Sequence, residues 1–192
     1  MTAKIACARN GPYLASDVPD LPQGAALCRC GGSKNKPFCD GTHRSNGFSD
    51  RNGADPARNR RETYAGKHIT IYDNRAICAH AGICTDKLAS VFRYGEEPWI
   101  DPDGAAVERI KETIRQCPSG ALSYAGAEPL ERASKITPTA NGPYAVTGGI
   151  ELAGVTFGDG ASREHYTLCR CGASKNKPFC DGSHWDAGFK DG

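Results

Sequence analysis

The stretch CRCGGSKNKPFCDGTH at residues 28–43, the first motif, returns at residues 169–184 as CRCGASKNKPFCDGSH, the second motif. The copies are identical at 14 of 16 positions, although few of the shared residues are apolar. A common hydrophobic core cannot explain such identity, so we interpret the repeat as a duplicated site. Three thiols and one imidazole on a loop rich in Gly, Ser, Lys and Asn predict a metal centre in each copy. The candidate ligands are Cys28, Cys30, Cys39 and His43 in the first motif and Cys169, Cys171, Cys180 and His184 in the second.

The ligand spacing in both motifs is C-x-C-x8-C-x3-H. Structural zinc loops usually present C-x2-4-C, whereas C-x-C brings two sulfurs together across one residue, which better fits one iron of a two-iron cluster. The spacing therefore favours a 2Fe-2S cluster, with zinc as the alternative. The Asp-Gly steps at 40–41 and 181–182 predict turns into short helices with Asp as the N-cap.

Composition and charge narrow the class of protein. The chain has 24 basic and 22 acidic residues, which gives no reason to expect a nucleic acid or an anionic membrane as partner. No stretch approaches the roughly 20 apolar residues that span a bilayer, and residues 1–13 lack the apolar run of a signal peptide. We therefore expect a soluble, cytoplasmic protein, in which ten cysteines favour metal binding over disulfides.

The repeat extends beyond the motifs. The turn sequence NGPY occurs at 10–13 and 141–144, an offset of 131, whereas the motifs are offset by 141. The second copy thus has ten extra residues, which we place in a longer hairpin loop around residues 155–161. Charged, Gly- and Pro-containing linkers at 49–60 and 125–138 bracket a middle segment. We predict three small domains, at residues 1–50, 61–125 and 136–192.

The middle segment has its own elements and its own cysteines. A period-two pattern predicts a strand at 68–72, and a helix is predicted from about 104 to 116, with Asp103 as N-cap, before a closing strand at 121–124. Val107, Ile110 and Ile114 lie on one face of this helix at helical spacing. The pattern is typical of a small α+β domain.

Three cysteines of the middle segment are candidate ligands. Cys78 and Cys84 occur in CAHAGIC, and Cys117 is followed by Pro118, as in bacterial ferredoxins, but Ala81 stands where their middle cysteine would fall. Three thiolates make a 3Fe-4S cluster the simplest expectation. A 4Fe-4S cluster is the alternative if His80, water or a partner supplies the last ligand. We expect His80 to be hydrogen-bonded near the cluster, and the leftover Cys7 to be a packing residue.

Both kinds of segment resemble known families. CRCGGSKNKPFCDGTH and CRCGASKNKPFCDGSH resemble the CDGSH iron-sulfur (mitoNEET-like) family, with Thr42 in place of Ser in the first copy. The resemblance implies one 2Fe-2S cluster per motif, with Cys28 and Cys30 on one iron and Cys39 and His43 on the other, and likewise in the second motif. It also implies that the two β-rich halves pair within one chain as a pseudo-dimer, so that a monomer suffices. Residues 67–124, through ICAHAGIC, EEPWI and CPSGALSY, resemble the divergent mono-cluster ferredoxin family.

The overall expectation is an α+β, three-cluster iron-sulfur protein that transfers electrons. We find no Ser-His-Asp grouping, no G-x-G-x-x-G and no phosphate loop, so we expect no enzymatic substrate site. The expected partners are redox proteins, or apo-protein cluster acceptors if the protein is instead a cluster carrier or a redox and pH sensor. The third hypothesis is a zinc-stapled interaction module. Because His removes negative charge relative to Cys, His43 and His184 should raise the cluster potentials above those of all-Cys centres.

Overall fold

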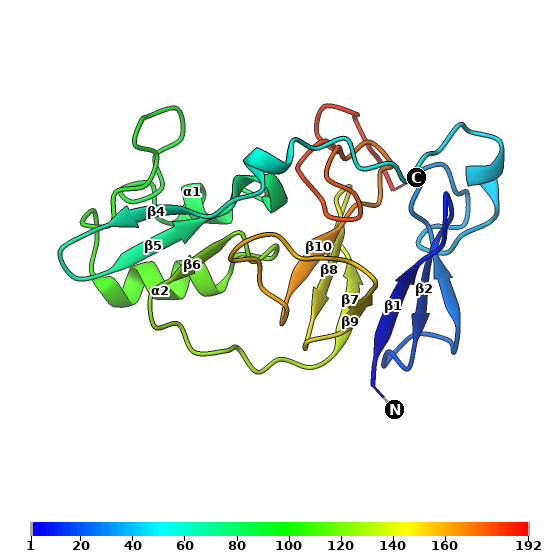
Figure 1. Cartoon of the computed structure of the whole chain (residues 1–192), viewed down its shortest axis with the longest axis horizontal. Helices are drawn as coiled ribbons and strands as arrows, with labels where there is room; N and C mark the ends of the chain where they lie inside the picture. The colour runs from blue at the N-terminus through cyan, green and yellow to red at the C-terminus, as the bar shows by residue number, and fades with distance from the viewer. Residues whose placement is uncertain (1, 192) are drawn as a thin grey trace.

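The computed structural model describes residues 2–191, and it is mostly β with few helices. Three small sheets are ordered β3-β2-β1-β9, β10-β8-β7 and β4-β5-β6 (Figure 1). The strands are β1 (Lys4–Cys7), β2 (Tyr13–Ser16), β3 (Ala25–Leu27), β4 (Glu62–Ala65), β5 (Thr70–Asp73), β6 (Leu122–Tyr124), β7 (Lys135–Pro138), β8 (Tyr144–Thr147), β9 (Glu151–Ala153) and β10 (Tyr166–Leu168). The helices are α1 (Ile83–Lys87) and α2 (Val107–Arg115), with 3-10 turns η1 (Thr42–Arg44), η2 (Pro56–Arg58) and η3 (Arg75–Ile77).

The two repeat units build equivalent antiparallel sheets. Strands β1, β2 and β3 of the N-terminal unit correspond to β7, β8 and β10 of the C-terminal unit. The ten extra residues do more than lengthen a hairpin loop, because the β8–β10 connection contains β9, which pairs in parallel with β1. Ile5 pairs with Leu152 in this register, and both side chains are buried. The C-terminal unit therefore contributes a strand to the sheet of the N-terminal unit.

The middle unit packs α2 against its sheet through the predicted helix face. Ile110 and Ile114 are buried and Val107 is half-buried. The predicted start of this helix was wrong: α2 begins at Val107 with Ala106 as N-cap. Asp103 lies three residues before this N-cap, where Gly104 N donates to Asp101 O at 3.1 Å in a turn, and the Oδ1 of Asp103 accepts from the Lys67 backbone N at 2.8 Å.

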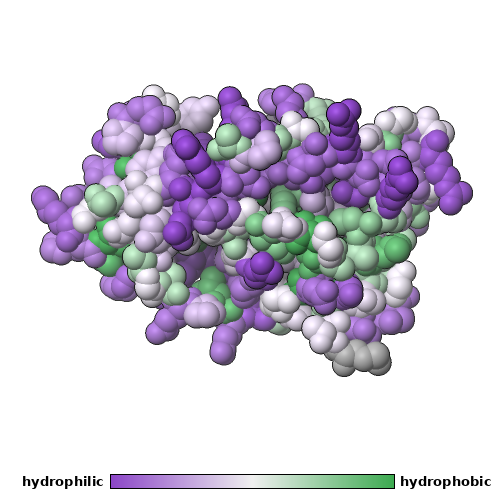
Figure 2. Space-filling model, viewed as in Figure 1, coloured by the Kyte–Doolittle hydropathy of each residue, from purple (hydrophilic) through white to green (hydrophobic). Residues whose placement is uncertain are grey.

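The three units lie in a row. Figure 1 shows the middle unit at one end, the C-terminal unit in the centre and the N-terminal unit at the other end. Hydrophilic residues cover most of the face seen in Figure 2, with hydrophobic residues showing mainly around the strands of the repeat units. Within residues 2–191, no helix is long and apolar enough to cross a membrane. Large hydrophobic side chains that are exposed in this range are Leu14, Tyr94 and Trp185.

Candidate metal centres

The polar residues of each motif hold its loop in shape. In the first motif, Ser33 Oγ donates to Phe38 O at 2.6 Å, while Asp40 accepts from the backbone N of Lys34 at 2.8 Å and of Thr42 at 3.0 Å. These amides hold the pKa of the Asp40 carboxyl well below its usual range. The second motif repeats the bonds through Ser174, Lys175, Asp181 and Ser183.

The short helix after Asp40 is confirmed as the 3-10 turn η1, but its predicted cap was wrong. Gly41, with φ +92°, occupies the N-cap position, and no side chain caps the turn. The carboxylate of Asp40 instead spans the loop from Lys34 to Thr42. The aspartate of the motif therefore links the two ends of the ligand loop by hydrogen bonds.

The candidate ligands of each motif lie in two pairs. In the first motif, Cys28 Sγ and Cys30 Sγ are 3.9 Å apart, and Cys39 Sγ lies 3.3 Å from His43 Nδ1. The corresponding distances in the second motif are 3.7 Å between the sulfurs of Cys169 and Cys171 and 3.5 Å from Cys180 Sγ to His184 Nδ1.

These pairs fit the chemistry of a two-metal centre. Two ligands of one tetrahedral metal, with bonds of about 2.3 Å to sulfur and about 2.05 Å to nitrogen, lie about 3.8 Å apart for two sulfurs and about 3.5 Å apart for sulfur and nitrogen. Every pair in both motifs matches one of these separations. Among residues 2–191, no three His, Cys, Asp or Glu side chains lie close enough together to hold a single metal ion. The donor set therefore fits two metals with two protein ligands each.

Backbone N–H groups already point at the sulfurs. Gly32 N lies 3.4 Å from Cys30 Sγ, and Ala173 N lies 3.4 Å from Cys171 Sγ. The hydrogen bond from the Cys169 thiol lowers the pKa of Cys171 to about 7 and, in return, raises the pKa of Cys169 well above its ordinary value. The pair thus readily holds one thiolate, which is the metal-binding form.

Two tyrosines brace the motifs across the repeat. Tyr13 of the N-terminal unit donates its hydroxyl hydrogen bond to Cys169 O at 2.9 Å and Pro178 O at 3.0 Å. Tyr144 of the C-terminal unit donates to Cys28 O and Pro37 O, both at 2.9 Å. The rings meet edge to face with centroids 6.1 Å apart. Each unit therefore supports the ligand loop of the other.

Replacing Tyr13 by Phe should destabilise the fold and loosen the second motif. The change leaves the carbonyl of Cys169 without a donor, whereas Pro178 O still accepts from Cys169 N, and we expect a cost of about 1–2 kcal/mol of unfolding free energy. Tyr144→Phe should have the same effect through the first motif, whereas Tyr94→Phe, at a residue that is 91% exposed, should change little. Urea unfolding of the three variants measures this. Equal free energies of unfolding for all three variants would show that the hydrogen bonds of Tyr13 and Tyr144 across the repeat do not stabilise the fold.

The motifs also meet back to back. Cys30 and Cys171 form an isolated antiparallel β-bridge between the two loops. The next residues, Gly31 and Gly172, have φ of +77° and +79°. A Cβ at Gly31 would lie 2.6 Å from Cys171 O, and one at Gly172 would lie 2.8 Å from Cys30 O. Only glycine permits both the backbone conformation and this close approach.

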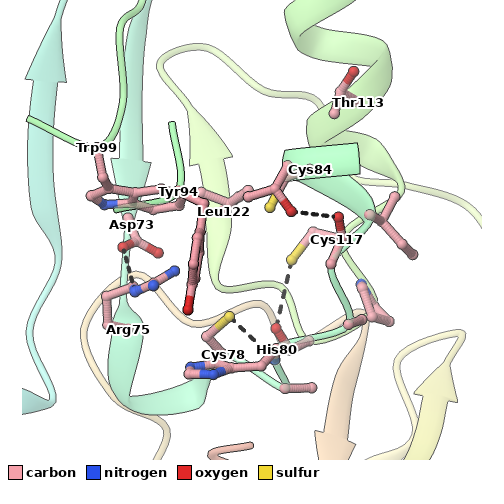
Figure 3. Close-up of a pocket in the computed structure, with 17 residues that line it drawn as sticks. Asp73, Arg75, Cys78, His80, Cys84, Tyr94, Trp99, Thr113, Cys117 and Leu122 are labelled. Carbon is pink, nitrogen blue, oxygen red and sulfur yellow. Dashed lines mark hydrogen bonds and ion pairs between the residues drawn. The ribbon is translucent and has the colours of Figure 1, made fainter. Parts of the chain in front are cut away.

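The middle unit brings its three cysteines to one cavity of about 150 Å³. Cys78 follows η3, Cys84 lies in the first turn of α1 and Cys117 follows α2, and Figure 3 shows all three sulfurs facing the same space. Burial raises the pKa of the Cys78 thiol to about 12 and also raises that of Cys84. Metal binding would have to displace these protons, so the site should bind metal more weakly at low pH.

His80 lies at the edge of this cavity. Its backbone N, and not its imidazole, donates to Cys78 Sγ at 3.4 Å. The imidazole packs on Gly182 of the second motif, because a Cβ built there would lie 2.8 Å from His80 Cγ. The ring therefore belongs to the contact between the middle unit and the second motif.

Several residues around the sites were missed in the sequence. Arg29 and Arg170, between the first two cysteines of each motif, are buried, and Arg170 donates to Gly142 O and Thr139 O at 2.9 Å. The sequence signal that could have identified these arginines is their presence between the two cysteines of both CRC stretches. His165 is buried, and its Nδ1 is hydrogen-bonded to Glu164 and Ser162.

Asp73, at the end of β5, is a buried acid in the wall of the middle cavity. It is 1% exposed, and neither carboxylate oxygen has a hydrogen-bond partner among the described residues. Arg75 Nε lies 3.9 Å away, too far for a hydrogen bond. Burial raises the pKa of Asp73 to about 7, more than Arg75 lowers it. No sequence signal distinguishes it from an ordinary strand-end aspartate.

Comparison with known families agrees with these sites. The model of the family described as iron-binding zinc finger CDGSH type matches residues 8–44 and 141–185. The model described as divergent 4Fe-4S mono-cluster matches residues 64–127. The chain belongs to both families, with two CDGSH motifs flanking a divergent 4Fe-4S mono-cluster domain. The residue pairs described above thus lie in iron-binding motifs.

Two curated relatives are similar to part of this CDGSH and mono-cluster protein. They are the uncharacterized protein YjdI of Escherichia coli strain K12 and that of Escherichia coli O157:H7, each 43% identical over 61 residues. The similarity covers 32% of this chain and 80% of each relative. No solved structure matches the chain.

Proposed function

We propose that the protein is an electron carrier with a 2Fe-2S cluster in each CDGSH motif and a third cluster in the mono-cluster domain. The pairing of ligands carries the proposal: each motif offers two sulfurs for one metal and a sulfur with an imidazole for the other. Iron-sulfur clusters supply one-electron chemistry. No other redox group is suggested by the described residues, and the sequence offers no substrate motif.

The surrounding residues would hold and tune these sites. In the first motif, Cys28 and Cys30 would bind one iron, and Cys39 and His43 the other; Cys169 with Cys171 and Cys180 with His184 would do so in the second. The buried guanidinium groups of Arg29 and Arg170 pair with Asp50 and Asp191 and so hold the start of each motif in place. The N–H···S contacts stabilise the negative charge of the thiolates.

In the mono-cluster domain, Cys78, Cys84 and Cys117 would hold a cluster of the 3Fe-4S type in its simplest form. The domain's family description is 4Fe-4S, which needs a fourth ligand. The imidazole of His80 packs on Gly182 in this arrangement, so a fourth ligand from water or a partner suits the site better.

Iron and sulfide analysis joined to EPR of the oxidised and reduced protein tests the proposal. Two 2Fe-2S clusters with a 3Fe-4S cluster give about seven irons and an oxidised-state signal, and a 4Fe-4S cluster gives about eight irons. A red-brown protein with iron and sulfide in these amounts is the expected result. A colourless protein that contains zinc would overturn the proposal in favour of a zinc-stapled module.

A second candidate function, cluster delivery to an apo-protein or release under redox or acid stress, is supported by the position of the first motif. Cys39 and His43 line an open surface groove with Arg9 and Arg44, and both candidate ligands are half-buried. A partner could reach them directly. The proposed partners are therefore redox proteins for electron transfer, or apo-proteins for delivery.

Replacing His43 by Cys should lower the potential of the first-motif cluster by roughly 100–300 mV, because a thiolate adds negative charge. The same change should slow cluster loss in mild acid, since no imidazole remains to take a proton at the iron. Redox titration and visible absorbance at pH 5–6 measure these effects, with His68→Ala outside the motifs as the control. If acid loss is unchanged in His43→Cys and His184→Cys, histidine does not control cluster release.

A further inference from the structure

The two motifs have almost the same sequence but different surroundings. Cys180 and His184 of the second motif are 3% and 5% exposed, whereas Cys39 and His43 at the same positions of the first motif are half-buried. Figure 1 places the second motif between the mono-cluster domain and the N-terminal unit. The difference must therefore come from what covers the second motif.

The mono-cluster domain covers it with one segment, residues 76–80, which carries Cys78. Trp185 Nε1 donates to His80 O at 3.2 Å, and Asn176 Nδ2 donates to Ala76 O at 2.8 Å. The His80 imidazole lies directly on Gly182. Three contacts thus join the segment that holds a candidate ligand of the middle site to the loop that holds Cys180 and His184.

The first motif has no equivalent cover within the described residues. Asn35, at the position of Asn176, is exposed, whereas Asn176 is 3% exposed. A Cβ at Gly41 would meet nothing within 4 Å, although Gly41 occupies the position of Gly182. The side of the first motif that corresponds to the mono-cluster contact is therefore open to solvent.

The second motif also touches the first, through the Cys30–Cys171 bridge. We propose that the second CDGSH motif connects the other two sites inside the protein. It is coupled to the mono-cluster domain through the contact of His80 with Gly182, and to the first motif through Cys30 and Cys171. The first motif is the outward site that meets a soluble one-electron carrier. This inference rests on the proposed electron-transfer function. Each transfer moves one electron and no atom, so one site is oxidised as its neighbour is reduced, and the external carrier supplies or accepts the electron.

The paired glycines provide a matched test. Gly41 and Gly182 have nearly the same left-handed φ, +92° and +87°, so alanine strains the backbone equally at both. Only at Gly182 does the new methyl group collide with His80. The readout is the magnetic interaction between the mono-cluster centre and the second-motif centre in EPR of the reduced, cluster-loaded full chain, with signals assigned through Cys39→Ser and Cys180→Ser.

We expect Gly182→Ala to weaken this interaction and Gly41→Ala to leave it unchanged. Adding His80→Ala to Gly182→Ala removes the colliding ring and should restore the interaction. A soluble paramagnetic ion should broaden the first-motif signal more than the second-motif signal. Equal effects of the two alanines, or loss of the interaction in Cys39→Ser but not in Cys180→Ser, would overturn the inference. Absence of iron would instead overturn the proposed function.

Discussion

Gly172→Ala should lower the free energy of unfolding more than any surface substitution does, and the variant should lose iron from both CDGSH motifs. The new methyl group would lie 2.8 Å from Cys30 O, and the backbone at φ +79° disfavours a side chain. The left-handed conformation alone costs roughly 1–2 kcal/mol, and the clash with backbone, which cannot rotate away, should bring the total to about 3 kcal/mol or more. Gly31→Ala should behave alike, because its Cβ would meet Cys171 O at 2.6 Å.

Gly24→Ala is the control for Gly172→Ala, because it has the backbone strain without the steric clash. Gly24 has φ +69°, but a Cβ there would meet nothing within 4 Å. Its alanine variant should therefore lose only roughly 1–2 kcal/mol and keep its iron. Urea unfolding and iron content measure both effects. Equal losses in Gly24→Ala and Gly172→Ala would show that the contact between the two motifs does not stabilise the protein.

Asp73→Asn should remove a loss of stability that the wild-type protein suffers as pH rises from about 4 to about 7. Burial raises the pKa of Asp73 to about 7 in the folded protein, whereas an unfolded aspartate titrates near about 3.9. The folded state therefore binds more protons than the unfolded state in this range. The stability that this extra proton on Asp73 contributes is fully present below the pKa of the unfolded aspartate. It is lost as pH rises through the pKa of Asp73 in the folded protein.

The expected size of this loss is up to about 4 kcal/mol, from roughly three pKa units at 1.36 kcal/mol each. An asparagine has the same shape but no charge to desolvate, so the variant should be the more stable protein at pH 8. Unfolding by urea at pH 5 and pH 8 tests this, and the difference between wild type and variant cancels the titration of other groups. The same pH dependence in both proteins would show that Asp73 is not the cause.

Much of each site followed from sequence because it is local. The ligand pairs Cys28–Cys30 and Cys39–His43 lie two and four residues apart, and the bonds that shape the loop join residues no more than six apart. Short-range chemistry of this kind is the same wherever the motif is placed. The buried face of α2 was predictable for a similar reason, since Ile110 and Ile114 follow helical spacing. The helix start was not, because Gly104 forms a turn with Asp101 before the helix begins at Val107.

The sequence by itself predicted the candidate ligands and the duplicated loop, and the resemblance to the CDGSH family implied how the ligands pair, because all of these depend on neighbours along the chain. Only the tertiary structure decided that β9 joins the other unit's sheet, that Tyr13 supports Cys169 from 156 residues away and that Asp73 is buried without a hydrogen-bond partner. It also decided that His184 is covered while His43 faces a groove. Two nearly identical motifs cannot encode that difference themselves, because it comes from the mono-cluster domain packed on one of them.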